Sequence, residues 1–280
     1  MAGAALGWGR DIAADDCGET RFVAAGPRGS ETDTVRAAIL GAGIGRRLEM
    51  PELPPKVLLD FAGESLLARH VRLLRACGVE RIDLAVGHRA EAVAAEIERI
   101  GAGDVVATRY NPDYERGAIV SLWTLREAFT SGEPVIFMDG DVLYDARMLR
   151  RLVASAHGDC FLMDRRTEEG EDPVRLCMNG GTLVDFHKRP QRAHDWWGEW
   201  IGFARFAPET AAGIAAAAGG YVEAGRLDEI YEEAFRDVLL AAPRGSFGVE
   251  DVTGLPWVEI DFPEDLEKAR NEILPLLDDG

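Results

Sequence analysis

Cysteine is scarce in this sequence, and its four copies lie far apart along the chain. They are Cys17, Cys77, Cys160 and Cys177. None has the C-x-x-C spacing that zinc sites and dithiol redox motifs require, so we expect reduced thiols and a cytoplasmic location. Long apolar runs are missing as well. Because no stretch of about 18 consecutive apolar residues occurs, the sequence predicts no transmembrane helix and no membrane partner.

Basic residues are outnumbered by acidic ones. The 31 Lys and Arg residues face 49 Asp and Glu residues, which gives a formal net charge of -18. A chain this acidic repels phosphate backbones at long range, so the composition argues against nucleic acid as a partner. Small anionic ligands are still compatible with this composition, since a local basic pocket or a bound metal overcomes the repulsion from the net negative charge.

The first 34 residues lack the periodic apolar pattern of a folded segment. They are rich in Gly, Ala, Asp and Thr, and Asp11, Asp15 and Asp16 fall where the apolar core of a signal peptide would lie. We therefore interpret residues 1–34 as a disordered extension with no fold of its own. Residues 35–280 are expected to form one domain.

From residue 35 onward the sequence alternates between strand and helix signals. Apolar runs typical of buried strands lie at 35–40, 81–86, 105–109 and 134–138, and helical spacing of apolar residues lies at 65–77, 90–100 and 119–129. This order predicts an α/β fold, a Rossmann-like mixed, mostly parallel sheet flanked by helices. Such sheets bind ligands at the carboxyl ends of their strands.

The second half of the chain has a different texture. Residues 174–178 and 182–188 flank a turn made of Asn179, Gly180 and Gly181, which predicts a small β-hairpin acting as a lid. Further strands are expected at 200–206 and 257–260, and helices at 211–218, 227–240 and 263–277. No internal repeat and no clear linker is visible.

A glycine-rich loop, LGAGIGRRLEMPELPPK, spans Leu40 to Lys56. It does not fit the G-x-G-x-x-G fingerprint of dinucleotide sites, because the third glycine is replaced by Arg46 or Leu48, depending on the starting position. Prolines also interrupt the helix that should follow. A glycine turn with arginines and a lysine suits a triphosphate, because backbone N–H groups surround the phosphates while Arg47 and Lys56 neutralise their charge.

Carboxylates follow two of the apolar strands. Asp139 and Asp141 end the segment VIFMDGD, and Glu259 and Asp261 end the segment WVEID. Residues two apart on a strand share a face, and a few hard oxygen ligands are what nucleotide-bound Mg²⁺ requires. The alternative for Asp261 is an N-cap of the following helix, which is also our interpretation of Asp145.

The pattern GAGIGRRL followed by PPK resembles the signature of the sugar-phosphate nucleotidyltransferase superfamily (MobA-like NTP transferases, with a GT-A-like fold). More narrowly, it is similar to the phosphocholine and phosphonate cytidylyltransferase branch. The resemblance implies catalytic roles for Lys56 and Arg47 and a Mg²⁺ site made by Asp141 and Asp261. It also implies a nucleotide-binding set, which comprises Leu40, Gly41, Ala42, Gly43, Gly45, Arg46, Asn111, Ser121 and Asp139.

Three members of that set have competing interpretations. Arg46 fits an exposed surface charge as well as it fits a phosphate contact, and Ser121 fits an ordinary helix-face hydroxyl. Asn111 opens the segment NPDYERGAIVSL, which resembles a family element with a Ser-Leu pair. This chain has Gly117 and Ala118 before that pair, where many phosphocholine-type relatives carry two Asn residues.

An aromatic segment, HDWWGEWIGF, predicts the acceptor site, which we place around residues 165–210. Tryptophan faces together with a carboxylate are what an ammonium group prefers, so we assign Trp197, Trp200 and Glu199 to an acceptor with a cationic head. Lys188 is assigned to the acceptor phosphate. The alternative is that the indoles, Trp196 included, cover a sheet edge or form a subunit contact, which keeps a homodimer open.

These features predict a Mg²⁺-dependent nucleotidyltransferase that uses CTP and a small phosphorylated or phosphonylated alcohol, such as phosphocholine or an aminoalkyl- or hydroxyalkylphosphonate. Its products would be a CDP derivative or phosphonate analogue and pyrophosphate. A sugar- or inositol-1-phosphate nucleotidyltransferase is the nearest alternative, and another nucleoside triphosphate stays open. Two alternatives belong to other classes: a nicotinamide-dependent oxidoreductase and a non-catalytic nucleotide sensor.

Overall fold

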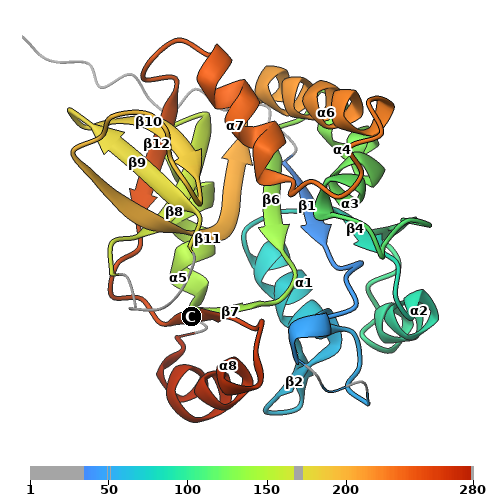
Figure 1. Cartoon of the computed structure of the whole chain (residues 1–280). Helices are drawn as coiled ribbons and strands as arrows, with labels where there is room; N and C mark the ends of the chain where they lie inside the picture. Colours follow the sequence, from blue (N-terminus) through green and yellow to red (C-terminus); the bar gives the residue numbers. More distant parts are fainter. Residues whose placement is uncertain (1–34, 49, 51, 167–172, 279–280) are drawn as a thin grey trace, which may run out of the picture. The chain divides into compact units, whose positions relative to one another are not determined.

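A nine-stranded mixed sheet forms the centre of the computed structural model, which describes residues 35–48, 50, 52–166 and 173–278 (Figure 1). The predicted extension 1–34 lies outside the described residues. The strand order is β10-β9-β11-β6-β1-β4-β5; off this path, β8 pairs with β11, and β12 pairs with β8. The prediction of a mixed sheet flanked by helices is confirmed.

The parallel half of the sheet follows the predicted strands closely. Its strands are β1 (Arg36–Leu40), β4 (Arg81–Val86), β5 (Val106–Tyr110) and β6 (Val135–Asp139). Its helices are α1 (Leu66–Ala76), α2 (Ala90–Arg99), α3 (Ala118–Thr124) and α4 (Arg126–Phe129). The helix expected at 119–129 is therefore two short helices. The central strands β1 and β6 are mostly apolar because helices cover both of their faces.

The second half adds the strands around β11. They are β8 (Asp159–Asp164), β9 (Arg175–Asn179), β10 (Thr182–His187), β11 (Trp196–Phe206) and β12 (Phe247–Asp251). The predicted hairpin is β9-β10, and β9 pairs with β11, so the hairpin extends the central sheet. Strand β11 is antiparallel to β6, β8 and β9 and begins earlier than the expected 200–206.

Two helices follow β11, with boundaries that differ from the prediction. They are α6 (Pro208–Glu223) and α7 (Glu232–Ala241). The α7 helix starts five residues later than the expected 227–240. Residues 227–229 instead run along the start of α3, where the carbonyls of Leu227 and Glu229 accept hydrogen bonds from the N–H groups of Gly117 and Ile119.

A second, two-stranded sheet lies beside the central one. Strand β7 (Val142–Tyr144) pairs with β13 (Trp257–Glu259), and α5 (Ala146–Val153) follows β7 with Asp145 as its N-cap, as predicted. The helix expected at 263–277 is broken into α8 (Pro263–Lys268), a π turn (Ala269–Ile273) and a 3-10 turn (Leu274–Leu276). Pro275 has no N–H to donate, so a regular helix cannot continue through it.

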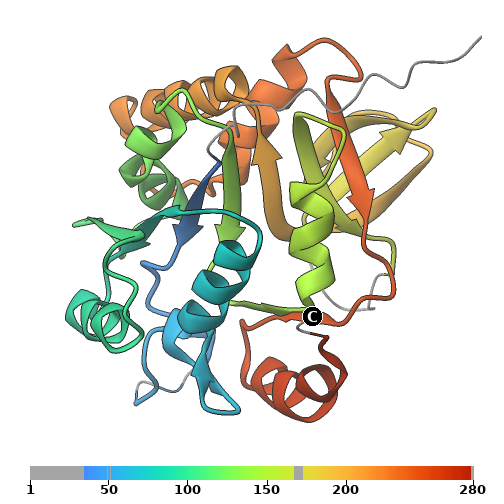
Figure 2. The same cartoon turned by 180° about the vertical axis from the view of Figure 1, so that it is seen from behind.

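Short elements complete the described chain: 3-10 turns at Arg46–Leu48 and Lys56–Leu58, and the small hairpin β2 (Asp60–Phe61) and β3 (Glu64–Ser65). Figures 1 and 2 show α6 and α7 on one face of the sheet and α1 and α5 on the other. A buried apolar layer fills each side. Among the described residues, no helix has both the length and the apolar character needed to cross a bilayer.

Candidate active site

The glycine-rich loop and the Asp139–Asp141 turn begin at neighbouring strand ends. Strands β1 and β6 are parallel and pair Leu40 with Asp139, and the N–H of Gly140 donates to the carbonyl of Leu40 at 2.9 Å. A Cβ atom on residue 140 would lie 2.4 Å from that carbonyl oxygen, so glycine is required there. The register of one strand pair thus brings both predicted motifs to one edge of the sheet.

The small sheet brings the third motif to the same place. Because β7 and β13 are antiparallel, the N–H of Ile260 donates to the carbonyl of Asp141 at 3.0 Å. Carboxylate oxygens of Asp141, Glu259 and Asp261 lie within 4.8 Å of one another. Such a set of hard oxygen donors fits a divalent cation such as Mg²⁺. The prediction that Asp141 and Asp261 lie together is confirmed, and Glu259 is an additional candidate ligand.

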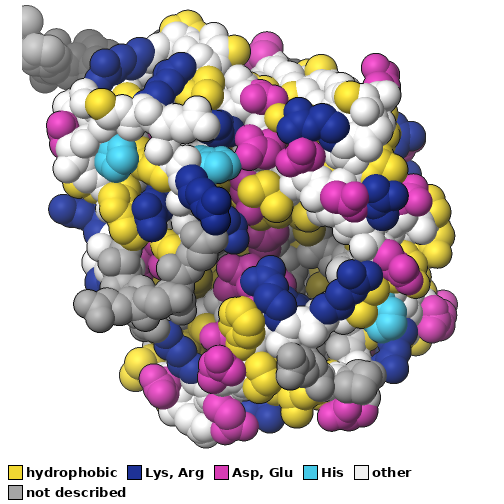
Figure 3. Space-filling model, in the orientation of Figure 1, with side chains coloured by type: hydrophobic (Ala, Val, Ile, Leu, Met, Phe, Trp, Pro, Cys, Tyr) yellow, Lys and Arg dark blue, Asp and Glu magenta, His cyan; other side chains and the backbone are white. Residues whose placement is uncertain are grey.

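Lys56 connects two of these carboxylates. Its Nζ atom donates to Oδ2 of Asp141 at 2.9 Å and to Oδ1 of Asp261 at 2.7 Å. Desolvation would lower the pKa of Lys56, but the charges of Asp141 and Asp261 outweigh it and hold that pKa above its ordinary value. Arg47 is more exposed and donates from Nη1 to Oδ2 of Asp261 at 2.6 Å. Figure 3 shows acidic side chains inside a hollow with Lys and Arg at its rim.

Asp139 is held differently from Asp141. The hydroxyl of Tyr231, at the start of α7, donates to Oδ2 of Asp139 at 2.5 Å. Desolvation, followed by the charges of Asp141 and Glu259, raises the pKa of Asp139 well above its ordinary value, and the Tyr231 hydrogen bond opposes this effect. Glu259 is exposed as a residue, yet desolvation of its carboxylate and the charges of Asp141 and Asp261 raise its pKa as well. The site therefore gathers negative charge that a bound cation would relieve.

The glycine-rich loop has room for a ligand at its tip. Gly41 is buried and lies against Val57 and Ala85, so its lack of a side chain serves packing. Gly43 is exposed, and a Cβ atom there would meet nothing within 4 Å, so packing within the chain does not require glycine. Gly45 has a φ of +70°, in the left-handed region. These features are those of a backbone that anionic groups can approach closely.

Arg46 points across the loop opening. One of its terminal nitrogens, Nη2, donates to the carbonyl of Glu115 at 3.4 Å, and its side chain is exposed. Ala42 is buried, so only its backbone can face a nucleotide, whereas Leu40 is half-buried. The assignment of Arg46 to phosphate binding stays a prediction.

The predicted contact between Asn111 and the nucleotide is wrong in this structure. The Asn111 side chain is fully buried, and both of its amide atoms are engaged. Its Nδ2 donates to Oγ of Ser121 at 3.0 Å, and its Oδ1 accepts from the N–H of Asp113 at 2.9 Å. Asn111 therefore shapes the loop and orients the Ser121 hydroxyl, which is itself buried.

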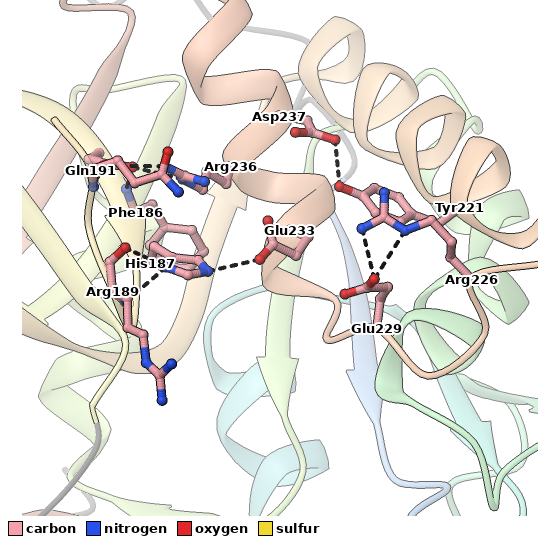
Figure 4. A network of polar contacts seen from close by, with 11 residues as sticks. Phe186, His187, Arg189, Gln191, Tyr221, Arg226, Glu229, Glu233, Arg236 and Asp237 are labelled. Carbon is pink, nitrogen blue, oxygen red and sulfur yellow. Dashed lines mark hydrogen bonds and ion pairs between the residues drawn. The ribbon is translucent and has the colours of Figure 1, made fainter. Parts of the chain in front are cut away.

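Lys188 lies on a segment fastened to α7. The end of β10 contributes Asp185, which is fully buried and bonds Arg236, and His187, whose Nε2 is 2.8 Å from Oε1 of Glu233 (Figure 4). The hydrogen bonds of Asp185 outweigh desolvation and lower its pKa to about 2. Lys188, half-buried, follows directly and is close enough to influence the pKa of Glu232, the first residue of α7.

The predicted tryptophan pocket needs correction. Trp200 is 5% exposed, its indole N–H donates to the carbonyl of Phe203 at 3.0 Å, and its ring packs among core aromatics. It is a core residue and presents no face to an acceptor. Arginine guanidinium groups lie over the other two indoles, Arg165 over Trp196 and Arg175 over Trp197.

Glu199 stands on β11 opposite Arg175 of β9 and Asp164 of β8. Its side chain is half-buried. Its assignment to the acceptor stays a prediction.

A substitution separates the core role of Trp200 from an acceptor role. Trp200→Phe removes volume from the aromatic core, so we expect the free energy of unfolding to fall by roughly 1–3 kcal/mol. At a temperature where the variant is folded, KM for the acceptor should stay within about twofold of the parent value, because no ligand contact is lost. Chemical denaturation and steady-state kinetics measure the two effects. A raised acceptor KM without loss of stability would contradict the core assignment.

Three residues of this site escaped the sequence-based prediction altogether. His70 lies on the buried face of α1, and its Nε2 atom is 3.1 Å from the carbonyl oxygen of Gly140. Burial lowers the pKa of His70 to about 4, so the ring is neutral and donates its Nε2–H to that carbonyl. It thereby supports the Asp139–Asp141 turn. Tyr231 and Glu232 fall inside the helix that the sequence predicts at 227–240. The one available signal was a lone histidine on an otherwise apolar helical face.

Comparison with known proteins agrees with this geometry. Residues 37–195 match the MobA-like NTP transferase domain. The chain belongs to this family. The resemblance seen in the glycine-rich loop is thereby confirmed, and with it a nucleotidyltransferase type of enzyme.

Two curated relatives are similar over most of the chain. The bifunctional IPC transferase and DIPP synthase of Rubrobacter xylanophilus is 31% identical over 244 residues, which cover 86% of this chain and 52% of the relative. The CMP-5'-(3-aminopropyl)phosphonate synthase of Streptomyces rubellomurinus is 30% identical over 256 residues, covering 86% of this chain and 39% of the relative. The chain thus spans about half or less of these relatives' length.

Two solved structures share the fold. The CTP:phosphocholine cytidylyltransferase from Streptococcus pneumoniae has a TM-score of 0.68 at 20% identity, covering 84% of this chain and 97% of that one. The inositol-1-phosphate CTP transferase from T. maritima also has a TM-score of 0.68 at 20% identity, covering 87% and 95%. At this identity the likeness concerns the fold alone.

Proposed function

We propose that this chain is a Mg²⁺-dependent cytidylyltransferase, which transfers CMP from CTP to a small phosphorylated or phosphonylated alcohol and releases pyrophosphate. The observation that carries the proposal is the contact of one lysine, Lys56, with both Asp141 and Asp261 beside an open glycine-rich loop. The names of three proteins described above contain CMP or CTP, which supports a cytidine nucleotide as the donor.

The chemistry needs positioning more than covalent catalysis. An oxygen of the acceptor's phosphate or phosphonate attacks the α-phosphorus of CTP, a new P–O bond forms, and the bond to the β-phosphate breaks as pyrophosphate leaves. A divalent ion at the three carboxylates would supply charge neutralisation for the phosphates. Lys56 is placed to stabilise charge that develops on the α-phosphoryl group, and Arg47 to stabilise the leaving pyrophosphate.

The acceptor has two chemical candidates. One is an alcohol phosphate or phosphonate with a nitrogen head group, as in the aminopropylphosphonate of one relative's name; the other is a polyol such as the inositol 1-phosphate of one structural neighbour's name. Both present a phosphoryl oxygen as nucleophile, so the acidic cluster and Lys56 serve either equally. Residues outside that cluster must discriminate between them.

Pyrophosphate release tests the proposal. The assay contains the full chain, Mg²⁺, one of four nucleoside triphosphates and one acceptor: phosphocholine, phosphoethanolamine, 2-aminoethylphosphonate, 2-hydroxyethylphosphonate, inositol 1-phosphate or glucose 1-phosphate. We expect release with CTP that requires both acceptor and Mg²⁺, and a CMP-linked product by mass spectrometry.

Two outcomes would overturn the proposal. CTP binding without pyrophosphate release would indicate a nucleotide sensor, and quenching of tryptophan fluorescence by NADH together with hydride transfer would indicate an oxidoreductase. Release with another nucleoside triphosphate in place of CTP would keep the nucleotidyltransferase and replace the donor.

A further inference from the structure

One carboxylate at the edge of the site has an oxygen without a partner. Glu232, the first residue of α7, is 8% exposed, and its Oε2 atom has no hydrogen-bond partner among the described residues. Leaving a buried carboxylate oxygen unpaired destabilises a fold. Burial accordingly raises the pKa of Glu232 to about 7. An unpaired, buried Oε2 atom is unfavourable for folding. Its presence in Glu232 therefore points to a ligand that pairs with this oxygen.

The chain neighbours of Glu232 contact the acidic cluster and the segment of Lys188: the Tyr231 hydroxyl donates to Asp139, and Oε1 of Glu233 lies 2.8 Å from Nε2 of His187. The charge of Glu232 contributes to the raised pKa values of Asp139 and Glu259 on one side. On the other side, the charges of Lys188 and His187, from the end of β10, act on Glu232, and Glu233 adds a repulsive charge from α7 itself. The backbone at Glu232 is therefore tied to the acidic cluster on one side and to the end of β10, next to Lys188, on the other.

Two contacts hold Glu232 in place. The backbone just before α7 packs so tightly on α3 that a Cβ atom at Gly117 would lie 2.3 Å from the carbonyl oxygen of Glu229. One residue after Glu232, the bond between Glu233 and His187 joins α7 to β10 (Figure 4). The position of Glu232 relative to Lys188 is therefore set by the framework on both sides, as selective binding requires.

The charge around Glu232 favours a cationic group over a hydroxyl. The carboxylates of Asp139, Asp141, Glu232, Glu259 and Asp261 are linked by the effects of their charges on one another, and the lysines and arginine that act on them or pair with them are Lys56, Arg47 and Lys188. Of the three indoles assigned to a quaternary ammonium or to a sheet edge, Trp200 is buried, and an arginine already lies over one face of Trp196 and of Trp197. An unpaired carboxylate oxygen calls for an N–H donor, which a primary ammonium has and a quaternary one lacks.

We propose that Glu232 binds a primary ammonium group of the acceptor while Lys188 binds its phosphate or phosphonate, so that the substrate is a short aminoalkyl phosphate or phosphonate. This inference rests on the proposed cytidylyltransferase activity and names the acceptor class for the same site. Glu232 is then the specificity-determining residue that separates amino acceptors from polyol and quaternary ones.

A pair of acceptors that differ in one group tests the inference. 2-Aminoethylphosphonate and 2-hydroxyethylphosphonate differ only by the exchange of an ammonium for a hydroxyl. With CTP and Mg²⁺, we expect the parent protein to prefer the amino acceptor by roughly 100-fold in kcat/KM, since a charged hydrogen bond in a partly desolvated site is lost with the other. Phosphocholine should be disfavoured similarly.

The variant Glu232→Gln is expected to lower kcat/KM for the amino acceptor by roughly 30-fold or more, mainly through KM. The hydroxyl acceptor and the KM for CTP should change by less than about threefold, which also shows that the variant is folded. Glu232→Asp retains the charge and should retain part of the preference. Glu209→Gln, the same change in the exposed first turn of α6, should alter nothing.

The outcomes separate the two proposals. Activity with inositol 1-phosphate or 2-hydroxyethylphosphonate at or above the amino acceptors, lowered equally by Glu232→Gln, would overturn the role of Glu232 and leave the cytidylyltransferase intact. An unchanged amino preference in Glu232→Gln would also overturn it. Absence of pyrophosphate release with every acceptor would refute the cytidylyltransferase, and the inference with it.

Discussion

Replacing Asp141 or Asp261 by Asn is expected to lower kcat roughly 1,000-fold, because each change removes an anionic oxygen from the proposed Mg²⁺ site. The parent protein brings three carboxylates within 4.8 Å of one another, and a divalent cation would relieve the repulsion among them. Binding of Mg²⁺ to the folded state alone should therefore raise the melting temperature of the parent. In both variants this rise should be much smaller, which links the kinetic loss to metal binding.

A matched variant controls for the loss of one negative charge. Asp104 is an exposed aspartate in the loop between α2 and β5, and it forms an ion pair with Arg75 of α1. Asp104→Asn should therefore leave both kcat and the Mg²⁺-dependent rise in melting temperature unchanged. Turnover within about tenfold of the parent in either Asp141→Asn or Asp261→Asn would place the metal elsewhere. Full Mg²⁺ stabilisation together with lost turnover would retain the metal site and give the replaced carboxylate another role.

The parallel half of the fold was predictable because its signals are local. The apolar run of β6 ends in Asp139, and a parallel strand exposes its carboxyl end at the ligand edge of the sheet. The glycine-rich loop follows β1 in the same way, so the meeting of Lys56 with Asp141 could be predicted from the motifs and the family resemblance. Its partner Asp261 was also predictable, since β13 ends in the same pattern as β6.

The acceptor side was harder because non-local packing decides it. Strand β11 begins at Trp196 and is interrupted by Gly202, whose φ of +83° shifts the register between Trp200 and Ala204. Simple alternation therefore cannot say which tryptophan faces the core. The sequence predicts Glu232 inside a helix at 227–240, whereas it is the first residue of α7. Residues 227–229 contact the start of α3 and thereby delay the start of α7, and this contact leaves no pattern in the sequence.

Replacing Lys56 by Ala should separate its role in stability from its role in catalysis. Without metal, Lys56 is the cation that bridges Asp141 and Asp261, and all three side chains are mostly buried. Its removal takes away the cation that bonds Asp141 and leaves Asp261 with Arg47 alone, so we expect the free energy of unfolding to fall by roughly 1–3 kcal/mol. Added Mg²⁺ should restore most of this loss, because the ion neutralises the same carboxylates, and the Mg²⁺-dependent rise in melting temperature should exceed that of the parent.

Turnover should not recover with stability. In Lys56→Ala, kcat is expected to fall by roughly 100- to 1,000-fold even at saturating Mg²⁺, because no ammonium remains to stabilise charge on the α-phosphoryl group. Lys56→Arg retains the positive charge and should therefore retain the stability of the protein without metal. Its kcat should stay low, because a planar guanidinium cannot replace a compact ammonium between two carboxylates. Recovery of both stability and turnover in Lys56→Ala on addition of Mg²⁺ would contradict this catalytic role. Lys56 would then only replace the metal ion when no metal is bound. Arg47 and the backbone of the glycine-rich loop would have to stabilise the charge on the α-phosphoryl group.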